Sequence, residues 1–181
     1  MLYDLRNSDL RLRWLVTLFL ATLGTSYLFG AWMVGLYAGF SPRKVGETYG
    51  PAGETSMVMQ MPPETTMVTE HHVSMAEMDE EQHHVDMDLL VQDTHVHMPM
   101  YAVLAACLSV IVLGLAISRT AALATITLLF AAPWLDFAGM WLTKLVSPHF
   151  AIVTLAGGWA MALGYLIVAV LATYQMWWRK T

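Results

Sequence analysis

The chain contains a single cysteine, Cys107, and this scarcity removes several kinds of site. One thiol cannot form a disulfide within the chain or build a cysteine-rich zinc cluster. The covalent haem c motif, C-x-x-C-H, is excluded as well because it needs two cysteines. We therefore expect no disulfide, no zinc cluster and no covalent haem to be built from this chain alone.

Charged residues are also scarce, at 13% of the 181 residues, and the net charge is −5. A surface that binds nucleic acid needs clustered Lys and Arg, so we expect no nucleic-acid partner. The sequence contains no nucleophile motif, phosphate-binding loop or dinucleotide fingerprint. We therefore expect a protein that is not an enzyme.

Four long apolar stretches occupy most of the chain, at residues 14–40, 99–118, 120–143 and 150–178. Each holds at least 20 residues, and Asp136 is the one formal charge among them. A helix needs about 20 predominantly apolar residues to cross roughly 30 Å of hydrocarbon. The sequence therefore predicts an all-α integral membrane protein, a four-helix bundle in contact with the lipid bilayer.

The basic residues predict how the bundle is oriented. With the N-terminus in the cytoplasm, six basic residues lie on the cytoplasmic side and three on the other side. This bias predicts both termini in the cytoplasm and residues 41–98 as one long extracytoplasmic loop. The six are Arg6, Arg11, Arg13, Arg119, Arg179 and Lys180, and the three are Arg43, Lys44 and Lys144.

Small residues recur at four-residue spacing in the first and fourth apolar stretches. Small side chains at this spacing let two membrane helices approach closely, because lipid offers no hydrophobic drive for their association. We expect these residues to form packing surfaces within the bundle or against a partner. They are Gly35 and Gly39 in the first stretch, and Ala156, Ala160 and Gly164 in the fourth.

The segment 41–98 differs in composition from the rest of the chain. It holds eleven acidic and two basic residues, six of the seven histidines and eight of the fourteen methionines. We expect its first part to be irregular, and we expect a short amphipathic helix near residues 74–92, where apolar side chains recur every three or four positions. Imidazole and thioether groups in such a segment are suitable copper ligands, and the alternative is a loop that only contacts water or a partner. The candidate ligands are His71, His72, His83, His84 and Met87.

A second candidate site is the H-x-H at the start of the second apolar stretch. Pro99 is typical of a first helical turn, so we expect the residues before it to be extended, with His95 and His97 on the same side. Together with Met98 they could bind copper, a haem iron or the magnesium of a chlorophyll. The alternative is that the two imidazoles hydrogen-bond to loop carbonyls.

A third candidate is Asp136, which lies inside the third apolar stretch. An unpaired carboxylate at membrane depth costs at least about 2.5 kcal/mol, so we expect Asp136 to face the interior of the bundle. Lys144, His149 and His97 are the expected partners in a buried polar cluster. Such a cluster could be a proton or ligand site, or it could only hold the helices together.

Several short motifs resemble those of small bacterial membrane proteins found beside electron-transfer complexes. The motifs are Thr94-His95-Val96-His97, then Leu135-Asp136 through Trp141-Leu142-Thr143-Lys144, and then Tyr174-Gln175-Met176-Trp177. The resemblance implies a similar fold and an electron-transfer neighbourhood. Some such proteins carry C-x-x-C-H in an outer loop, a motif that this chain lacks.

These observations favour a non-catalytic accessory subunit of a larger bacterial electron-transfer complex, either respiratory or a photosynthetic reaction centre with its antenna. Its partners would be other membrane subunits of that complex. One alternative is an extracytoplasmic copper-binding membrane protein. A second is a subunit that binds haem b or bacteriochlorophyll without a covalent bond, through His97 or His149.

Overall fold

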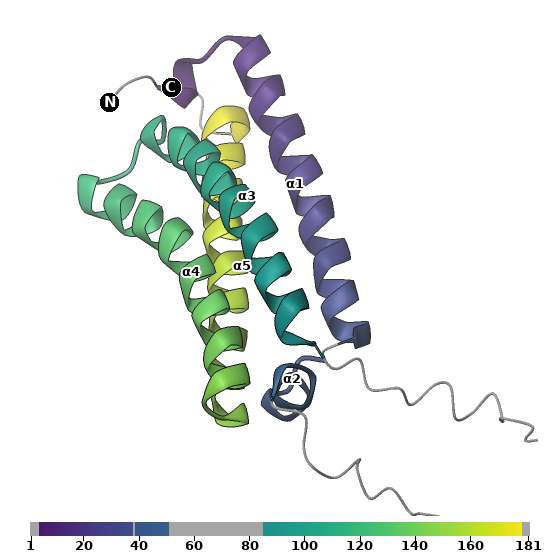
Figure 1. Cartoon of the computed structure of the whole chain (residues 1–181). Helices are drawn as coiled ribbons and strands as arrows, with labels where there is room; N and C mark the ends of the chain where they lie inside the picture. Colours follow the sequence, from purple (N-terminus) through teal and green to yellow (C-terminus); the bar gives the residue numbers. More distant parts are fainter. Residues whose placement is uncertain (1–3, 38, 51–84, 179–181) are drawn as a thin grey trace, which may run out of the picture.

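The computed structural model describes residues 4–37, 39–50 and 85–178. Four of its helical segments are long and apolar enough to cross a membrane, and the last of them includes the short turns at both of its ends. They pack side by side as a bundle, which confirms the expected all-α integral membrane fold (Figure 1). In chain order the segments are η1 (Leu5–Asn7), α1 (Leu10–Tyr37), α2 (Pro42–Tyr49), α3 (Met87–Leu113), α4 (Arg119–Leu145), η3 (Pro148–Phe150), α5 (Ala151–Thr173) and η4 (Tyr174–Trp178).

The expected bounds of the second span, 99–118, are wrong because α3 starts at Met87 and ends at Leu113. Pro99 therefore lies inside the helix rather than in its first turn. A proline in a helix interior costs about 3 kcal/mol, since it cannot donate a backbone hydrogen bond. Packing offsets this cost, because Leu90 is fully buried beside Phe137 and Met140 of α4. Here tertiary contacts extend the helix past the boundary that the proline suggests.

The segment after α1 also differs from expectation. Residues 42–49 form the short helix α2, with Ser41 accepting a hydrogen bond from the Lys44 backbone as its N-cap, where an irregular segment was expected. The expected amphipathic helix near residues 74–92 lies outside the described residues up to position 84. Its last residues belong to α3 and do not form a separate surface helix.

The closest helix contact in the bundle joins α4 to α5. A Cβ atom at Gly139 would lie 2.7 Å from Thr154 Cα, and a Cβ at Gly157 would lie 2.6 Å from Asp136 Cα. Carbon atoms without a bond between them prefer to be about 3.5–4.0 Å apart, so only glycine fits at these two positions. The two backbones therefore pack directly on each other.

One expected packing surface differs from the observed one. Gly39 is not on a helix face; its φ of 67° and its backbone bond to the Val34 carbonyl (2.7 Å) end α1. Glycine suits this left-handed position because it has no side chain. Gly35 is exposed beside Phe40, and Gly39 lies against the Lys44 side chain of the short helix α2, so neither glycine packs against another membrane-spanning helix.

In α5 the expected packing residues are only partly on the contact face. Gly164 is buried against Leu129 and Ala160 is half-buried, whereas Ala156 is exposed. The neighbouring Gly157 takes the place that was expected for Ala156.

Arg13 joins three segments at the end of the bundle where η1 and η4 meet. Its guanidinium donates to three backbone carbonyls: Nε to Ser8 (3.0 Å), Nη1 to Met176 (3.0 Å) and Nη2 to Arg6 (2.6 Å). A cation at the end of a helix satisfies carbonyls that have no partner within the helix and interacts favourably with the helix dipole. This junction ties the start of α1 to the end of α5.

The same end of the bundle is closed by two further contacts. The Leu5 backbone N–H donates to the Gly114 carbonyl (3.0 Å), and the Leu5 side chain is fully buried. The Gln175 Oε1 atom accepts a hydrogen bond from the Ala116 backbone (2.8 Å), which satisfies this amide although it is only 3% exposed. The turn between α3 and α4 is therefore held by residues from both ends of the chain.

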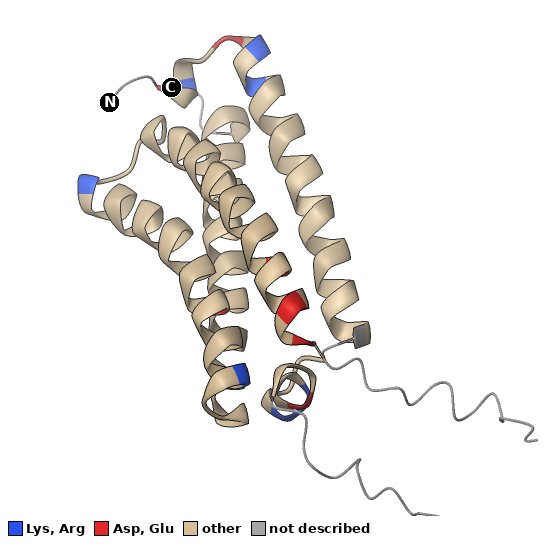
Figure 2. Cartoon of the chain, viewed as in Figure 1, with Lys and Arg blue, Asp and Glu red and all other residues tan. Residues whose placement is uncertain are grey.

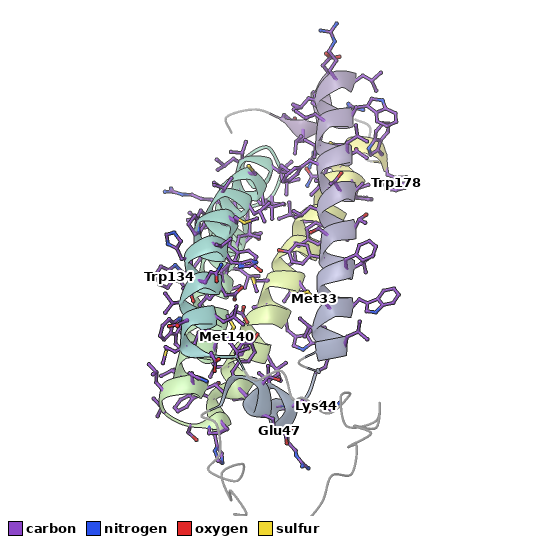
Figure 3. All side chains as sticks on the ribbon, turned by 45° about the vertical axis from the view of Figure 1, so that its right-hand side comes forward. Met33, Lys44, Glu47, Trp134, Met140 and Trp178 are labelled. Carbon is purple, nitrogen blue, oxygen red and sulfur yellow. The ribbon has the colours of Figure 1, made fainter. Side chains whose placement is uncertain are left out.

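The helix α1 is attached to the bundle along only part of its length. Val16, Leu20 and Leu23 are buried in the main apolar core, and the Tyr165 hydroxyl of α5 donates to the Leu20 carbonyl (2.7 Å). Further along, all of residues 31–36 are exposed. Figure 3 shows α1 beside α5 and apart from α4.

We predict that Gly157→Ala weakens the bundle whereas Gly158→Ala does not. The first substitution forces α4 and α5 apart and should cost about 1–3 kcal/mol of unfolding free energy. The second adds a methyl group in open space and should be neutral or slightly stabilising, because alanine favours helix. Thermal unfolding of both variants in one detergent, followed by circular dichroism, tests this difference, and equal midpoints would contradict it.

Candidate functional site

The candidate site lies where α2, the first turns of α3 and the last turns of α4 meet, at the opposite end of the bundle from η1 and η4 (Figure 1). Its centre is an apolar plug of buried residues: Leu90 from α3, with Phe137 and Met140 from α4. Around this plug lie the half-buried side chains of Tyr49, Val85, Met98, Tyr101 and Trp141. The polar residues of the site surround the plug, so the geometry of each depends on it.

His97 pairs with Asp93 one turn earlier on α3. The Nδ1 atom of His97 lies 2.9 Å from Asp93 Oδ1 and 3.0 Å from the Asp93 carbonyl. Nδ1 is therefore the protonated nitrogen, because both neighbours are acceptors. Both side chains are about two-fifths exposed, at 44% and 39%, so this contact contributes little stability. The effect of Asp93 is to fix the imidazole, with Nε2 as the nitrogen left for another group.

Two further hydrogen bonds tie the start of α3 to α4. The Trp141 indole N–H donates to Thr94 Oγ1 (3.0 Å), and Thr94 in turn donates to the Leu90 carbonyl (2.8 Å). Lys144 Nζ donates to the Val85 carbonyl (2.7 Å), directly before α3 begins. These contacts cross between helices whose apolar faces already pack together.

Asp136 lies on the face of α4 that packs on α5. A Cβ at Gly157 would meet the backbone and Cβ of Asp136, so this carboxylate is held close to the α4–α5 contact. Among the described residues, its oxygens make no hydrogen bond or ion pair. Burial, with the nearby charges of Asp93 and Asp136, raises the pKa of Tyr49 to about 12. Asp136 thus shares its surroundings with a second carboxylate and a phenol.

The expected cluster of Asp136, Lys144, His149 and His97 is therefore not the one observed. His97 is held by Asp93, while His149 Nδ1 lies 3.0 Å from Ser147 Oγ in the exposed turn before α5. The reason is helical geometry. Because α3 begins earlier than expected, Asp93 lies on this helix one turn before His97, whereas the η3 turn carries His149 to the exposed surface.

The expected H-x-H ligand pair is also wrong in its geometry. His95 and His97 both lie on α3, where residues two apart point about 200° away from each other. His95 is exposed, and His97 is half-buried beside Asp93. The expectation depended on an extended segment before Pro99, which the helix replaces. Met98 packs against the apolar plug.

The structure tests few of the proposed metal ligands. His71, His72, His83 and His84 lie outside the described residues, and Met87 is the exposed first residue of α3. Within residues 4–37, 39–50 and 85–178, no three His, Cys, Asp or Glu side chains are grouped so that they could hold a metal ion.

Sequence reasoning missed Asp93 and Tyr49, which share this end of the bundle with Asp136. The spacing of Asp93 and His97 is that of neighbours on a helix surface, so this pair could have been found if the helix had been expected there. Tyr49 gave no comparable signal, because its position depends on α2 packing against Pro148 through Gly46 and Gly50.

Comparison with known proteins supports the fold. Residues 39–181 match the model of a protein family described as a transmembrane helical domain. No curated protein and no solved structure matches the chain.

We predict that Tyr49 titrates near pH 12 instead of at the usual 10.0 for tyrosine. Because the folded state favours the neutral phenol, its stabilising contribution is complete below pH 10.0 and is lost as the pH rises through about 12. The difference in phenolate absorbance between the parent and Tyr49→Phe isolates this titration. Asp93→Asn should lower the Tyr49 pKa, and an ordinary pKa in the parent would show that the phenol is not buried beside these carboxylates.

Proposed function

We propose that this chain, which belongs to the Aq_1264_TM family of transmembrane helical domains, is a non-catalytic accessory subunit of a larger electron-transfer complex. The complex would lie in a bacterial inner membrane and be either respiratory or a photosynthetic reaction centre with its antenna. The resemblance of the motifs at His95, His97 and Lys144 supports the electron-transfer part of this proposal. The exposure of α1 supports the accessory part.

The observation that most directly supports a partner subunit is that residues 31–36 of α1 are all exposed. Six consecutive residues extend over more than one turn of 3.6 residues, so every side of the helix is at least partly exposed there. Gly30, directly before them, has open space where a side chain would be. Helices in lipid associate through close van der Waals packing at small residues. This part of α1 therefore suits a helix of another subunit.

The charge distribution supports the orientation that we propose. Figure 2 shows basic residues in η1 and at the starts of α1 and α4, at the end of the bundle where η4 lies, and others in α2 and at the end of α4 at the opposite end. The first group is Arg6, Arg11, Arg13 and Arg119. Basic residues near membrane helices favour the cytoplasmic side. We place this end in the cytoplasm, and α2 with the long segment after it on the periplasmic side.

Site-specific cross-linking tests the accessory role. A photoreactive amino acid in place of Met33 on α1 should form adducts with defined membrane chains in intact cells. The same amino acid in place of Leu163 on α5, a comparably exposed position, is the matched control and should react mainly with lipid. The captured chains should also co-purify in mild detergent and carry redox cofactors.

Two results would contradict the proposal. If both positions react only with lipid and the protein purifies alone, no partner helix covers α1. If the captured chains carry no redox cofactor, the accessory role stands and the electron-transfer assignment fails.

A second candidate function, the binding of haem b or bacteriochlorophyll, has one specific observation in its favour. Histidines that bind a metal usually donate the other ring N–H to a carboxylate or a backbone carbonyl, which fixes the orientation of the ring. Asp93 supplies both acceptors to His97 Nδ1, and Nε2 is then the nitrogen that would bind the metal. The copper alternative depends chiefly on loop residues outside the described part of the chain.

Absorbance spectra test this second candidate. If a haem or chlorophyll is bound through His97, the purified protein shows its absorption band and His97→Ala abolishes it. Asp93→Ala should weaken the binding about 10- to 100-fold, because it removes the side-chain acceptor that helps to orient the ring. His95→Ala is the matched control and should leave the band unchanged; a colourless protein, or a band that survives His97→Ala, would contradict the assignment.

A further inference from the structure

A cleft between the helices is lined by residues from all four membrane spans. Its walls are mostly apolar, with two phenols, one from α1 and one from α3, among the lining residues. The lining residues are Tyr27, Tyr101, Leu104, Ala105, Leu108, Leu129, Pro133 and Met161. A mostly apolar site with a few polar groups is the usual form of a small-molecule binding site.

The two phenols are the unusual feature of this cleft. Within the described part of the chain, neither the Tyr27 nor the Tyr101 hydroxyl makes a hydrogen bond, whereas the neighbouring Tyr165 hydroxyl donates to the Leu20 carbonyl (2.7 Å). No water in the hydrocarbon core can satisfy such groups, and an unmade hydrogen bond there is costly. The cleft therefore presents two donors that lack acceptors.

The depth of the cleft restricts what could supply those acceptors. Tyr27 and Tyr101 lie near the middle of α1 and α3, so a ligand has to be soluble in the membrane interior. It has to carry neutral acceptors, because a charged group is expensive at that depth. It should also have a flat ring, since two of the lining residues, Tyr27 and Tyr101, are aromatic and pack well against a planar group.

We propose that this cleft binds the ring of a lipid-soluble quinone, with Tyr27 and Tyr101 donating hydrogen bonds to its carbonyl oxygens. A quinone combines a flat apolar ring, neutral carbonyl acceptors and a long hydrocarbon tail. This proposal goes beyond the accessory role and does not depend on it. It concerns binding alone.

Entry of the ring requires α1 to move. The free volume of the cleft is about 10 Å³, whereas a cavity that accepts a benzene ring measures about 150 Å³. α1 is the helix that can yield, because residues 31–36 touch little of the bundle and α1 packs mainly on α5. The tail of the quinone would then leave the cleft beside α1 toward the lipid.

Binding of a short-tailed quinone to the full-length protein in detergent tests the proposal, with tryptophan fluorescence quenching as the readout. Tyr27→Phe and Tyr101→Phe should each weaken binding about 2- to 10-fold, because each removes one hydrogen bond and keeps the ring. Tyr174→Phe, at an exposed tyrosine of η4, is the matched control and should bind as the parent does. An alkylbenzene with the same tail and no carbonyls, measured by its displacement of the quinone, should bind more weakly than the quinone and be insensitive to both substitutions.

Three outcomes would overturn the proposal. The parent could fail to bind the quinone, both phenylalanine variants could bind it as tightly as the parent, or the alkylbenzene could bind equally well. Unchanged affinity of both variants would show that the phenols donate no hydrogen bond to the quinone, and equal binding of the alkylbenzene would show that the carbonyl groups are not recognised. Ala105→Phe provides a second test that does not depend on the phenols, because it fills a wall of the cleft and should abolish binding while the unfolding midpoint reports that the bundle is intact.

Discussion

The contact between α4 and α5 is the constraint on which the other helices depend. Gly139 and Gly157 let the two backbones pack directly, without side chains between them. In lipid, where hydrophobic burial gives helices little reason to associate, such close packing is a main source of stability. The apolar face of α4 around Phe137 packs against α3, and α1 is attached to the bundle along only part of its length. The tightness of the contact thus decreases from α4–α5 outward to α1.

The polar residues near α2 also depend on the packing of the helices. Thr94 and Trp141 are hydrogen-bonded across the packed contact between Leu90 and Phe137. A hydrogen bond between two residues that packing has already positioned costs less conformational entropy than one that must order both partners. The apolar plug therefore explains why these polar groups can be held in fixed positions at the edge of a membrane bundle, where water would otherwise compete for them.

Hydropathy alone was sufficient to predict the number and type of the spanning helices, because a spanning helix must satisfy its own backbone and be apolar throughout. The boundary at Pro99 could not be predicted in this way, since the local preference of proline opposed the burial of Leu90. The position of Tyr49 could not be predicted either, because it follows from the contact of α2 with Pro148, about a hundred residues away. Asp136 could be singled out as the one formal charge in the apolar stretches, but its neighbours depend on which residues the other helices bring to the same level.

Arg13 has a consequence for handling the protein. A guanidinium keeps its charge at any pH that a cell reaches, so the junction between α1 and η4 is not opened by acid or mild base. One of its three acceptors is the carbonyl of Met176, close to the end of the chain. A fluorescent reporter or an affinity handle fused after that position leaves all three acceptors in place. A truncation before Met176 would leave a permanent cation short of one acceptor at the membrane surface.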